Sequence, residues 1–109
     1  MPESETTLIY TTCPDLESAK AIGGHLVRNN LAACTNILPG MVSVFRWEGE
    51  IADEAEVAMI VKTRRALIDK VTAAIVEHHP YDTPAVVALP VVGGSVPFLA
   101  WIAAETADG

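Results

Sequence analysis

The longest strand-like stretch of the chain constrains its fold more than any other feature. Residues 31–47 (LAACTNILPGMVSVFRW) are rich in strand-forming types and, if extended, reach roughly 50 Å at about 3.3 Å per residue. The first strand candidate, residues 6–12 (TTLIYTT), is too short to pair with all of it. Part of the stretch must therefore project, with a bend or bulge at Pro39-Gly40. We expect a long hairpin with a turn at 47–50 and a return strand at 56–63 (EVAMIVKT).

Three helical patterns follow residues that can cap a helix N-terminus. The predicted helices and their capping residues are 16–29 after Asp15, 64–78 after Thr63, and 96–104 after Ser95. Gly23 and Gly24 lie inside the first helix, where each costs on the order of 1 kcal/mol relative to alanine. Close packing of this helix on a sheet would offset that cost. A nearly uncharged strand at 85–92, interrupted by Pro90, precedes the last helix.

The order of elements is strand, helix, strand, strand, helix, strand and a final helix. This order predicts an α+β fold, the ferredoxin-like split β-α-β sandwich (βαββαβ plus a C-terminal helix) with a long projecting hairpin. In that topology the fourth strand lies antiparallel beside the first, which brings Cys13 near His79 and Thr83. The acidic hairpin tip, residues 48–56, lies at the same end of the sheet. We expect one domain over residues 1–109, with residues 1–5 as a disordered tail.

The second and fourth strands would form the two edges of such a sheet. An unprotected apolar edge, such as residues 86–89 (VVAL), is an aggregation hazard. A second subunit that covered this edge with its long hairpin would remove the hazard. We therefore predict a closed homo-oligomer.

The charge balance excludes several classes of partner. Fourteen acidic residues against seven Lys and Arg give a net charge of −7, so no basic surface is available for nucleic acid or for anionic membranes. The sequence contains no membrane-length apolar run and no secretory signal pattern, which predicts a cytoplasmic protein. Cys13 and Cys34 are then expected to be free thiols, and since neither belongs to a CxxC pair, a structural zinc site is not indicated.

Six short motifs occur in an order and at spacings typical of a known family. They are residues 12–15 (TCPD), 31–36 (LAACTN), 47–49 (WEG), 56–57 with 62–63 (EV and KT), 79–81 (HPY), and 89–91 (LPV) with Trp101. Together, over about residues 7 to 104, they make the chain resemble the CutA divalent-cation tolerance proteins. The resemblance implies a ferredoxin-like homotrimer, a role in tolerance of copper and other divalent cations, and an architecture similar to the trimeric PII-type signalling proteins.

The resemblance also implies metal ligands. Relatives are associated with a thiol near the end of the first strand and with histidines before Pro-Tyr, roles that fall here on Cys13, His78 and His79. Some relatives place the thiol at the position of Thr11, and many have a glutamate where this chain has Ala85. Thiolate and imidazole suit copper or zinc better than magnesium or calcium. We expect Cu(II) or another divalent cation and no organic cofactor.

The same residues also have readings that need no metal. Adjacent histidines diverge on a helix and on a strand, and His78 and His79 could instead interact with the C-terminus of the second helix. Cys34 reads as a core residue, and the acidic turn as a solvated tip or a weak cation site. Cys13 and His79 have the types for a nucleophile and base, but no orienting acid is evident, so we predict no enzyme.

Two other functions stay open from the residues. One is a trimeric signalling protein that binds a small anionic ligand between subunits, with the Gly93-Gly94-Ser95 turn at a helix N-terminus as a possible anion site. The other is a stable scaffold whose partner no motif identifies.

Overall fold

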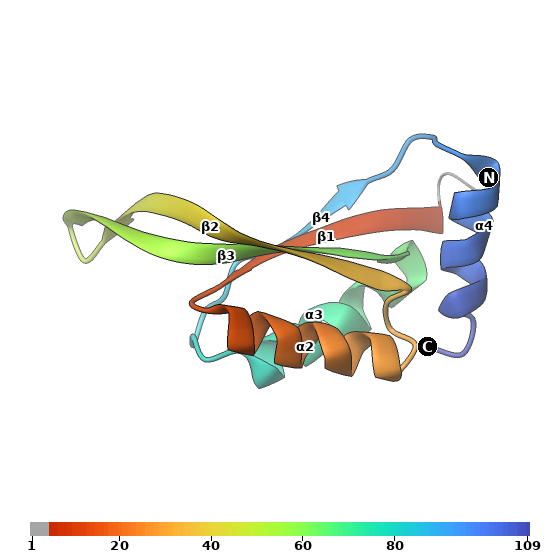
Figure 1. The fold of residues 1–109 in the computed structure, drawn as a ribbon, viewed down its shortest axis with the longest axis horizontal. Coiled ribbons are helices and arrows are strands. Elements are labelled where there is room, and N and C mark those ends of the chain that lie inside the picture. The colour runs from red at the N-terminus through yellow and green to blue at the C-terminus, as the bar shows by residue number, and fades with distance from the viewer. Residues whose placement is uncertain (1–4) are drawn as a thin grey trace.

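The computed structural model describes residues 5–109, so most of the predicted disordered tail, residues 1–4, lies outside the described chain. The elements in chain order are β1 (Thr6–Cys13), α2 (Leu16–Arg28), β2 (Cys34–Trp47), β3 (Glu50–Arg64), the 3₁₀ helix η1 (Arg65–Leu67), α3 (Ile68–His78), β4 (Val86–Pro90) and α4 (Val96–Glu105) (Figure 1). Within this range no helix is both long and apolar enough to span a membrane.

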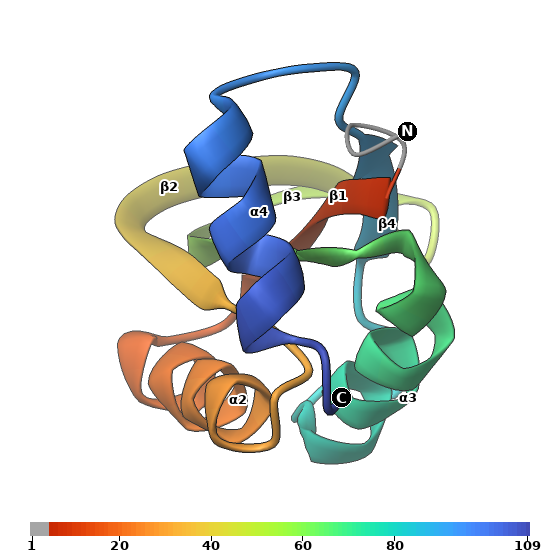
Figure 2. The same ribbon diagram turned by 90° about the vertical axis from the view of Figure 1, so that its right-hand side faces the viewer.

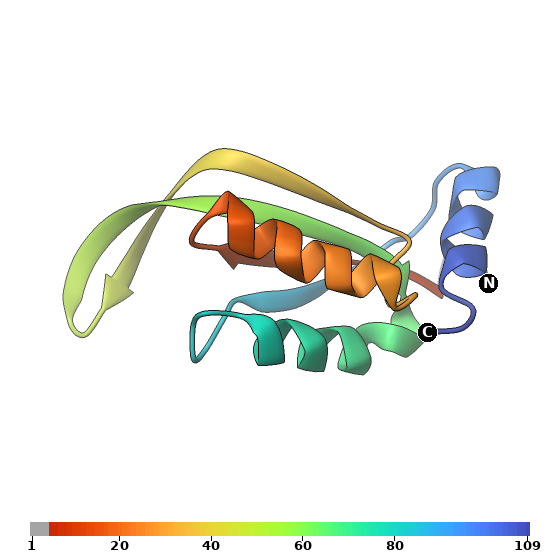
Figure 3. The ribbon, with the colours of Figure 1, turned by 60° about the horizontal axis from the view of Figure 1, so that its bottom comes forward.

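The four strands form one antiparallel sheet in the order β2-β3-β1-β4. Helices α2 and α3 run side by side beneath one face of the sheet (Figure 3). Helix α4 stands across the end of the sheet that lies away from the hairpin, as Figures 1 and 2 show. The arrangement confirms the predicted ferredoxin-like fold with its two edge strands and its projecting hairpin.

The two faces of the sheet differ in burial because successive strand residues point to opposite sides. Ile9, Cys13, Met59 and Val61 belong to the hydrophobic core together with the inward residues of α2 and α3. Residues of the other parity, such as Glu56, lie on the face that these two helices do not cover. The main core cluster therefore lies on the side of the sheet that α2 and α3 cover.

Helix α2 packs closely on this core side, as the two glycines predict. A Cβ atom on Gly23 would lie 2.8 Å from the Oγ1 of Thr35 and 3.2 Å from the Sδ of Met59. Gly24 is different, since its added Cβ would meet only the side chain of Arg28 from the same helix. Sheet packing therefore explains Gly23 and does not explain Gly24.

The hairpin formed by β2 and β3 extends beyond the rest of the sheet. Its ladder shifts register between Leu38 and Met41, where Gly40 has a φ of 87°, so the bulge lies where Pro39-Gly40 predicts it. Glu48 and Gly49 both have positive φ, 49° and 82°, which suits a tight two-residue hairpin turn. This short turn lets pairing begin at once, so β3 starts at residue 50 and not at the predicted residue 56.

The predicted start of the second helix was wrong. Thr63 is not a cap: it lies within β3, and its Oγ1 donates a hydrogen bond of 2.6 Å to the carbonyl of Leu31. Arg64 is still in the strand, and its guanidinium bonds Thr106 beyond α4. The chain then passes through η1, and α3 begins at residue 68 without a side-chain cap.

The other two predicted helix caps, at the N-termini of α2 and α4, have different outcomes. Asp15 caps α2 as predicted, because its carboxylate accepts a 2.7 Å hydrogen bond from the backbone N–H of Ser18. Ser95 precedes α4 but makes no capping bond with its side chain. Strand β4 covers only residues 86–90, since Pro90 cannot continue the ladder.

Candidate functional site

The segment after α3 is held against the end of β1 by one buried histidine. The Nε2 atom of His79 lies 2.7 Å from the carbonyl oxygen of Thr12, and its Nδ1 atom accepts a 3.1 Å hydrogen bond from the backbone N–H of Tyr81. Because Nδ1 accepts, Nε2 carries the proton and donates to the carbonyl. The sequence prediction that His79 lies beside residue 13 is confirmed, but both of its ring nitrogens already have partners.

Cys13 ends β1 and is fully buried among core residues on the helix-covered side of the sheet. Burial raises the pKa of its thiol, and the negative charges of Asp15 and Glu56 raise it further, against a smaller lowering from a hydrogen bond with Ser18. The favoured form is therefore the thiol, not the thiolate that binds metals.

His78 lies away from this pair, on the helical layer. As the last residue of α3 it packs its ring against His25 of α2, with ring centroids 4.3 Å apart. Its Nε2 is 4.0 Å from the carboxylate of Glu77, and the side chain is 41% exposed. The structure thus brings His78 to His25, a neighbour that the sequence reasoning missed, since no local spacing connects residues on two different helices.

Tyr81 and Glu56 form a second link between the loop after α3 and the sheet. The Tyr81 hydroxyl donates a 3.1 Å hydrogen bond to the Oε2 atom of Glu56. Burial, and next the hydrogen bond to Glu56, raise the pKa of Tyr81 to about 12. Sequence reasoning did not name Tyr81 as part of a site, and it considered Glu56 only within the acidic turn as a possible weak cation site. The signal that links the two residues is their presence in two family-like motifs, which lie far apart in the chain.

A cavity of about 650 Å³ opens beside this link, and we call it the hairpin pocket. Aromatic, acidic and small residues from the hairpin, from the end of β1 and from the loop before β4 form its walls. They are Thr12, Phe45, Trp47, Glu54, Glu56, Tyr81, Asp82, Thr83 and Ala85. The strand register places Phe45 opposite Ala52, so Phe45 and Trp47 share a sheet face with Glu54 and Glu56. None of the lining residues is basic.

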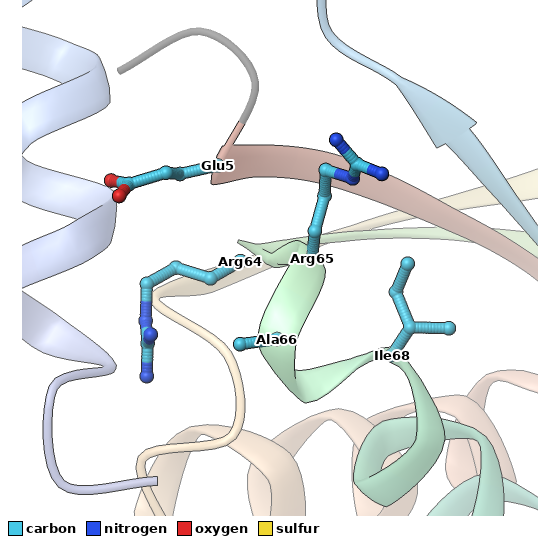
Figure 4. Close-up of a pocket in the computed structure, with 5 residues that line it drawn as sticks. All are labelled: Glu5, Arg64, Arg65, Ala66 and Ile68. Carbon is cyan, nitrogen blue, oxygen red and sulfur yellow. The ribbon is translucent and has the colours of Figure 1, made fainter. Parts of the chain in front are cut away.

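A second cavity, of about 390 Å³, lies at the opposite end of the sheet beside η1. Glu5, Arg64, Arg65, Ala66 and Ile68 line it, and the two arginine side chains point in different directions (Figure 4). Arg64 is held by Thr106, as described above, and Glu5 adds a negative charge. These residues do not converge on a single point as a built anion site would.

Within residues 5–109 no group of three or more His, Cys, Asp and Glu side chains is arranged to hold a metal ion. Cys13 and His79 have the right donor atoms, but the thiol is protonated and the imidazole is hydrogen-bonded on both sides. To bind a metal, Cys13 must lose its proton and His79 must give up one of its two hydrogen bonds.

The same hydrogen bonds argue against cysteine catalysis. A general base must reach the proton that it removes, whereas the Nε2–H of His79 is directed at a backbone carbonyl and its Nδ1 at a backbone amide. The imidazole therefore fixes the loop and does not activate Cys13.

Comparison with known proteins identifies the chain's relatives. The family model described as "CutA1 divalent ion tolerance protein" matches residues 7–105. The chloroplastic Protein CutA of Arabidopsis thaliana is 40% identical over 97% of this chain and 60% of its own length. The divalent-cation tolerance protein CutA of Thermus thermophilus is 37% identical over 91% of this chain and 96% of its own length.

A solved structure gives the same result in three dimensions. The crystal structure of CutA from Xylella fastidiosa superposes with a TM-score of 0.93 at 39% identity, covering 94% of this chain and 99% of the other. The chain spans about half to two-thirds of the length of the plant and animal relatives that it matches, 63% for rice, 60% for Arabidopsis and 52% for human.

Proposed function

Because the chain belongs to the CutA1 divalent ion tolerance protein family, we propose that it is a homotrimer that binds copper or a similar divalent ion. The family is one of divalent-cation tolerance proteins and not of enzymes. The observation that carries the proposal is the match over residues 7–105, which includes every residue of the candidate site. The convergence of Cys13 and His79 at one end of the sheet supports it.

We assign the metal ligands to Cys13, His78 and His79. The exposed imidazole of His78 is the most accessible of the three donors, whereas Cys13 and His79 are buried. Sulfur and nitrogen ligands suit copper, which is a soft or borderline cation. The two histidines point to different neighbours, so they would serve different ions or different subunits.

Metal affinity is expected to rise with pH. The pKa of the Cys13 thiol is raised, so a metal ion must displace a proton to bind it. One displaced proton makes the apparent affinity increase by about tenfold per pH unit below the thiol pKa. Cys13→Ser should lose the part of this dependence that the thiol proton contributes.

Calorimetric titration with Zn(II), and with Cu(II) under anaerobic conditions, tests the ligand set. Cys13→Ser and His78→Asn are expected to weaken binding by at least about tenfold. Cys34→Ser is the matched control for the thiol, since it removes the same chemical group outside the ligand set. His25 packs against the proposed ligand His78, so His25→Asn instead measures how much this neighbour contributes to binding. Unchanged affinity in Cys13→Ser and in a His78→Asn/His79→Asn double variant would reject this assignment.

Exposed apolar side chains support the trimer. Val87 and Leu89 on the edge strand β4, Phe98 and Trp101 on α4, and Val44 on the hairpin are all exposed in the single chain. A surface of this kind is typical of subunit interfaces. A solution mass of three chains, measured by light scattering at micromolar concentration, is expected. A stable monomer would contradict the proposal.

The anion-binding alternative has less support. The hairpin pocket is acidic, and neither of the two cavities includes Gly93, Gly94 or Ser95. A cytoplasmic location stays a prediction, because the Arabidopsis relative is described as chloroplastic.

A further inference from the structure

The charge of the hairpin pocket favours a positively charged ligand. Glu54, Glu56 and Asp82 line it, and no lining residue is basic. Of these carboxylates only Glu56 has a hydrogen-bond partner among residues 5–109, the hydroxyl of Tyr81. Three carboxylates without a counter-charge in one cavity attract a cation and repel an anion.

Aromatic side chains give the same pocket an affinity for a particular kind of cation. Phe45 and Trp47 are two residues apart on β2 and lie on the same side of the sheet as Glu54 and Glu56, and Tyr81 lines the pocket from the loop. Trp47 is 65% exposed in the single chain, so its indole is accessible there. A cation over an aromatic ring is attracted by the ring quadrupole, most strongly over tryptophan, and organic ammonium ions are recognised in this way.

The size of the cavity suits a small molecule. Its volume of about 650 Å³ falls within the range of about 300–1,000 Å³ typical of small-molecule sites. The small side chains of Thr83 and Ala85 leave room on the loop side. Aromatic walls contribute little to a hydrated inorganic ion, whereas they stabilise an apolar body attached to a positive charge.

We propose that the hairpin pocket binds a small organic cation, an ammonium or guanidinium group carrying an apolar body. The carboxylates of Glu54, Glu56 and Asp82 neutralise the charge, and the rings of Phe45 and Trp47 cover the body. The pocket borders one proposed metal ligand, since Tyr81 packs on His79 with ring centroids 4.9 Å apart, whereas the Cys13 side chain lies in the core on the other face of the sheet. The proposed organic ligand needs no metal ion, so its binding can be tested in the absence of metal, whatever the outcome of the metal titrations.

The test uses choline and its uncharged carbon isostere, 3,3-dimethylbutan-1-ol, which differ in charge at nearly constant shape. Binding is followed on the full-length protein, free of metal, through the NMR signals of the two indole N–H groups. We expect choline to shift the Trp47 signal saturably and to leave that of Trp101 on α4 unchanged. The isostere should bind at least about tenfold more weakly, and added salt should weaken choline binding.

Variants locate the site. Glu54→Gln, followed through the Trp47 signal, and Trp47→Leu, followed by calorimetric titration because it removes that signal, are each expected to weaken choline binding by about three- to tenfold. Asp53→Asn removes a neighbouring carboxylate on the opposite face of β3 and should leave the affinity unchanged, with folding of each variant checked by its solution mass. Equal binding of choline and its isostere, no saturable shift of Trp47, or full affinity in Glu54→Gln would each overturn the proposal.

Discussion

The two halves of β3 have the same backbone pairing but very different surroundings. Residues 57–63 lie between β2 and β1 and above both helices, and Val57, Met59, Val61 and Thr63 are buried there. Residues 50–56 pair with β2 alone, and most of their side chains are exposed. We call these the body half and the hairpin half.

The difference shows what each half depends on. The body half is stabilised by burial of apolar area in a core that the chain provides for itself. An isolated two-stranded hairpin is marginal in water, so the hairpin half needs additional contacts. Among residues 5–109 one such tie is the hydrogen bond between Glu56 and Tyr81. The rest of its surface remains available for a partner subunit or a ligand.

The largest effect on stability is expected from a substitution in the buried core of the body half. Met59→Ala removes a fully buried side chain and should lower the free energy of unfolding by about 2–5 kcal/mol, measured by denaturant titration. Val44→Ala is the control in the hairpin half, where the side chain is 70% exposed, and should cost less than about 0.5 kcal/mol within one chain. A larger loss at Val44 that depends on protein concentration would show that a partner subunit covers this half.

The next effect concerns the loop that approaches the hairpin half. His79→Ala leaves the Thr12 carbonyl and the Tyr81 amide without their partner, so we expect a loss of about 2–4 kcal/mol in unfolding free energy. His78→Ala, one residue earlier and exposed, should cost less than about 0.5 kcal/mol. Equal effects at the two positions would show that the His79 hydrogen bonds do not hold the loop.

Substitutions at the two glycines of α2 test how closely this helix packs on the body half of β3. Gly23→Ala forces a Cβ atom against Thr35 and Met59 and should destabilise the protein by about 1–3 kcal/mol. Gly24→Ala displaces only the flexible end of Arg28 and should stabilise it by up to about 1 kcal/mol. Thermal unfolding of the pair measures both signs, and destabilisation of equal size in both variants would contradict the packing described for Gly23.

The smallest effect tests the tie itself. Burial, and next the hydrogen bond to Glu56, raise the pKa of Tyr81 to about 12 from an unfolded value of about 10, so the protonated, hydrogen-bonded hydroxyl contributes its full stability below about pH 10. That contribution is lost as the pH rises from about 10 to about 12. The loss should be small because the group is largely solvated. Stability measured from pH 8 to 12 should converge with that of Tyr81→Phe, and parallel curves would argue against this bond.

The sequence predicted the body half well because local signals agreed with tertiary burial there. Strand-forming runs with the right order specify the ferredoxin-like topology, and the bulge at Pro39-Gly40 follows from backbone chemistry alone. The prediction from sequence failed where a local signal competed with a hydrogen bond to a residue far away in the chain. Thr63 resembles a helix cap, but its hydroxyl bonds Leu31 and keeps it in the strand.

The candidate site was predicted only in part for the same reason. The topology places Cys13 beside His79, but residue types do not reveal that both ring nitrogens of His79 bind backbone groups. The contact between His78 and His25 and the walls of the hairpin pocket depend on side chains from separate elements. Such juxtapositions follow from packing angles and twist, which no spacing in the sequence records.

The central position of β1 has a consequence for the timing of folding. The first strand of the chain pairs with β3 on one side and with β4 on the other, and the Thr7 hydroxyl donates a hydrogen bond to Leu89, 82 residues later. Although β1 is synthesised first, its hydrogen bonds to both neighbours can form only after β4 has been synthesised. Long loop closures of this kind slow folding and leave β1 open to wrong pairings on the ribosome.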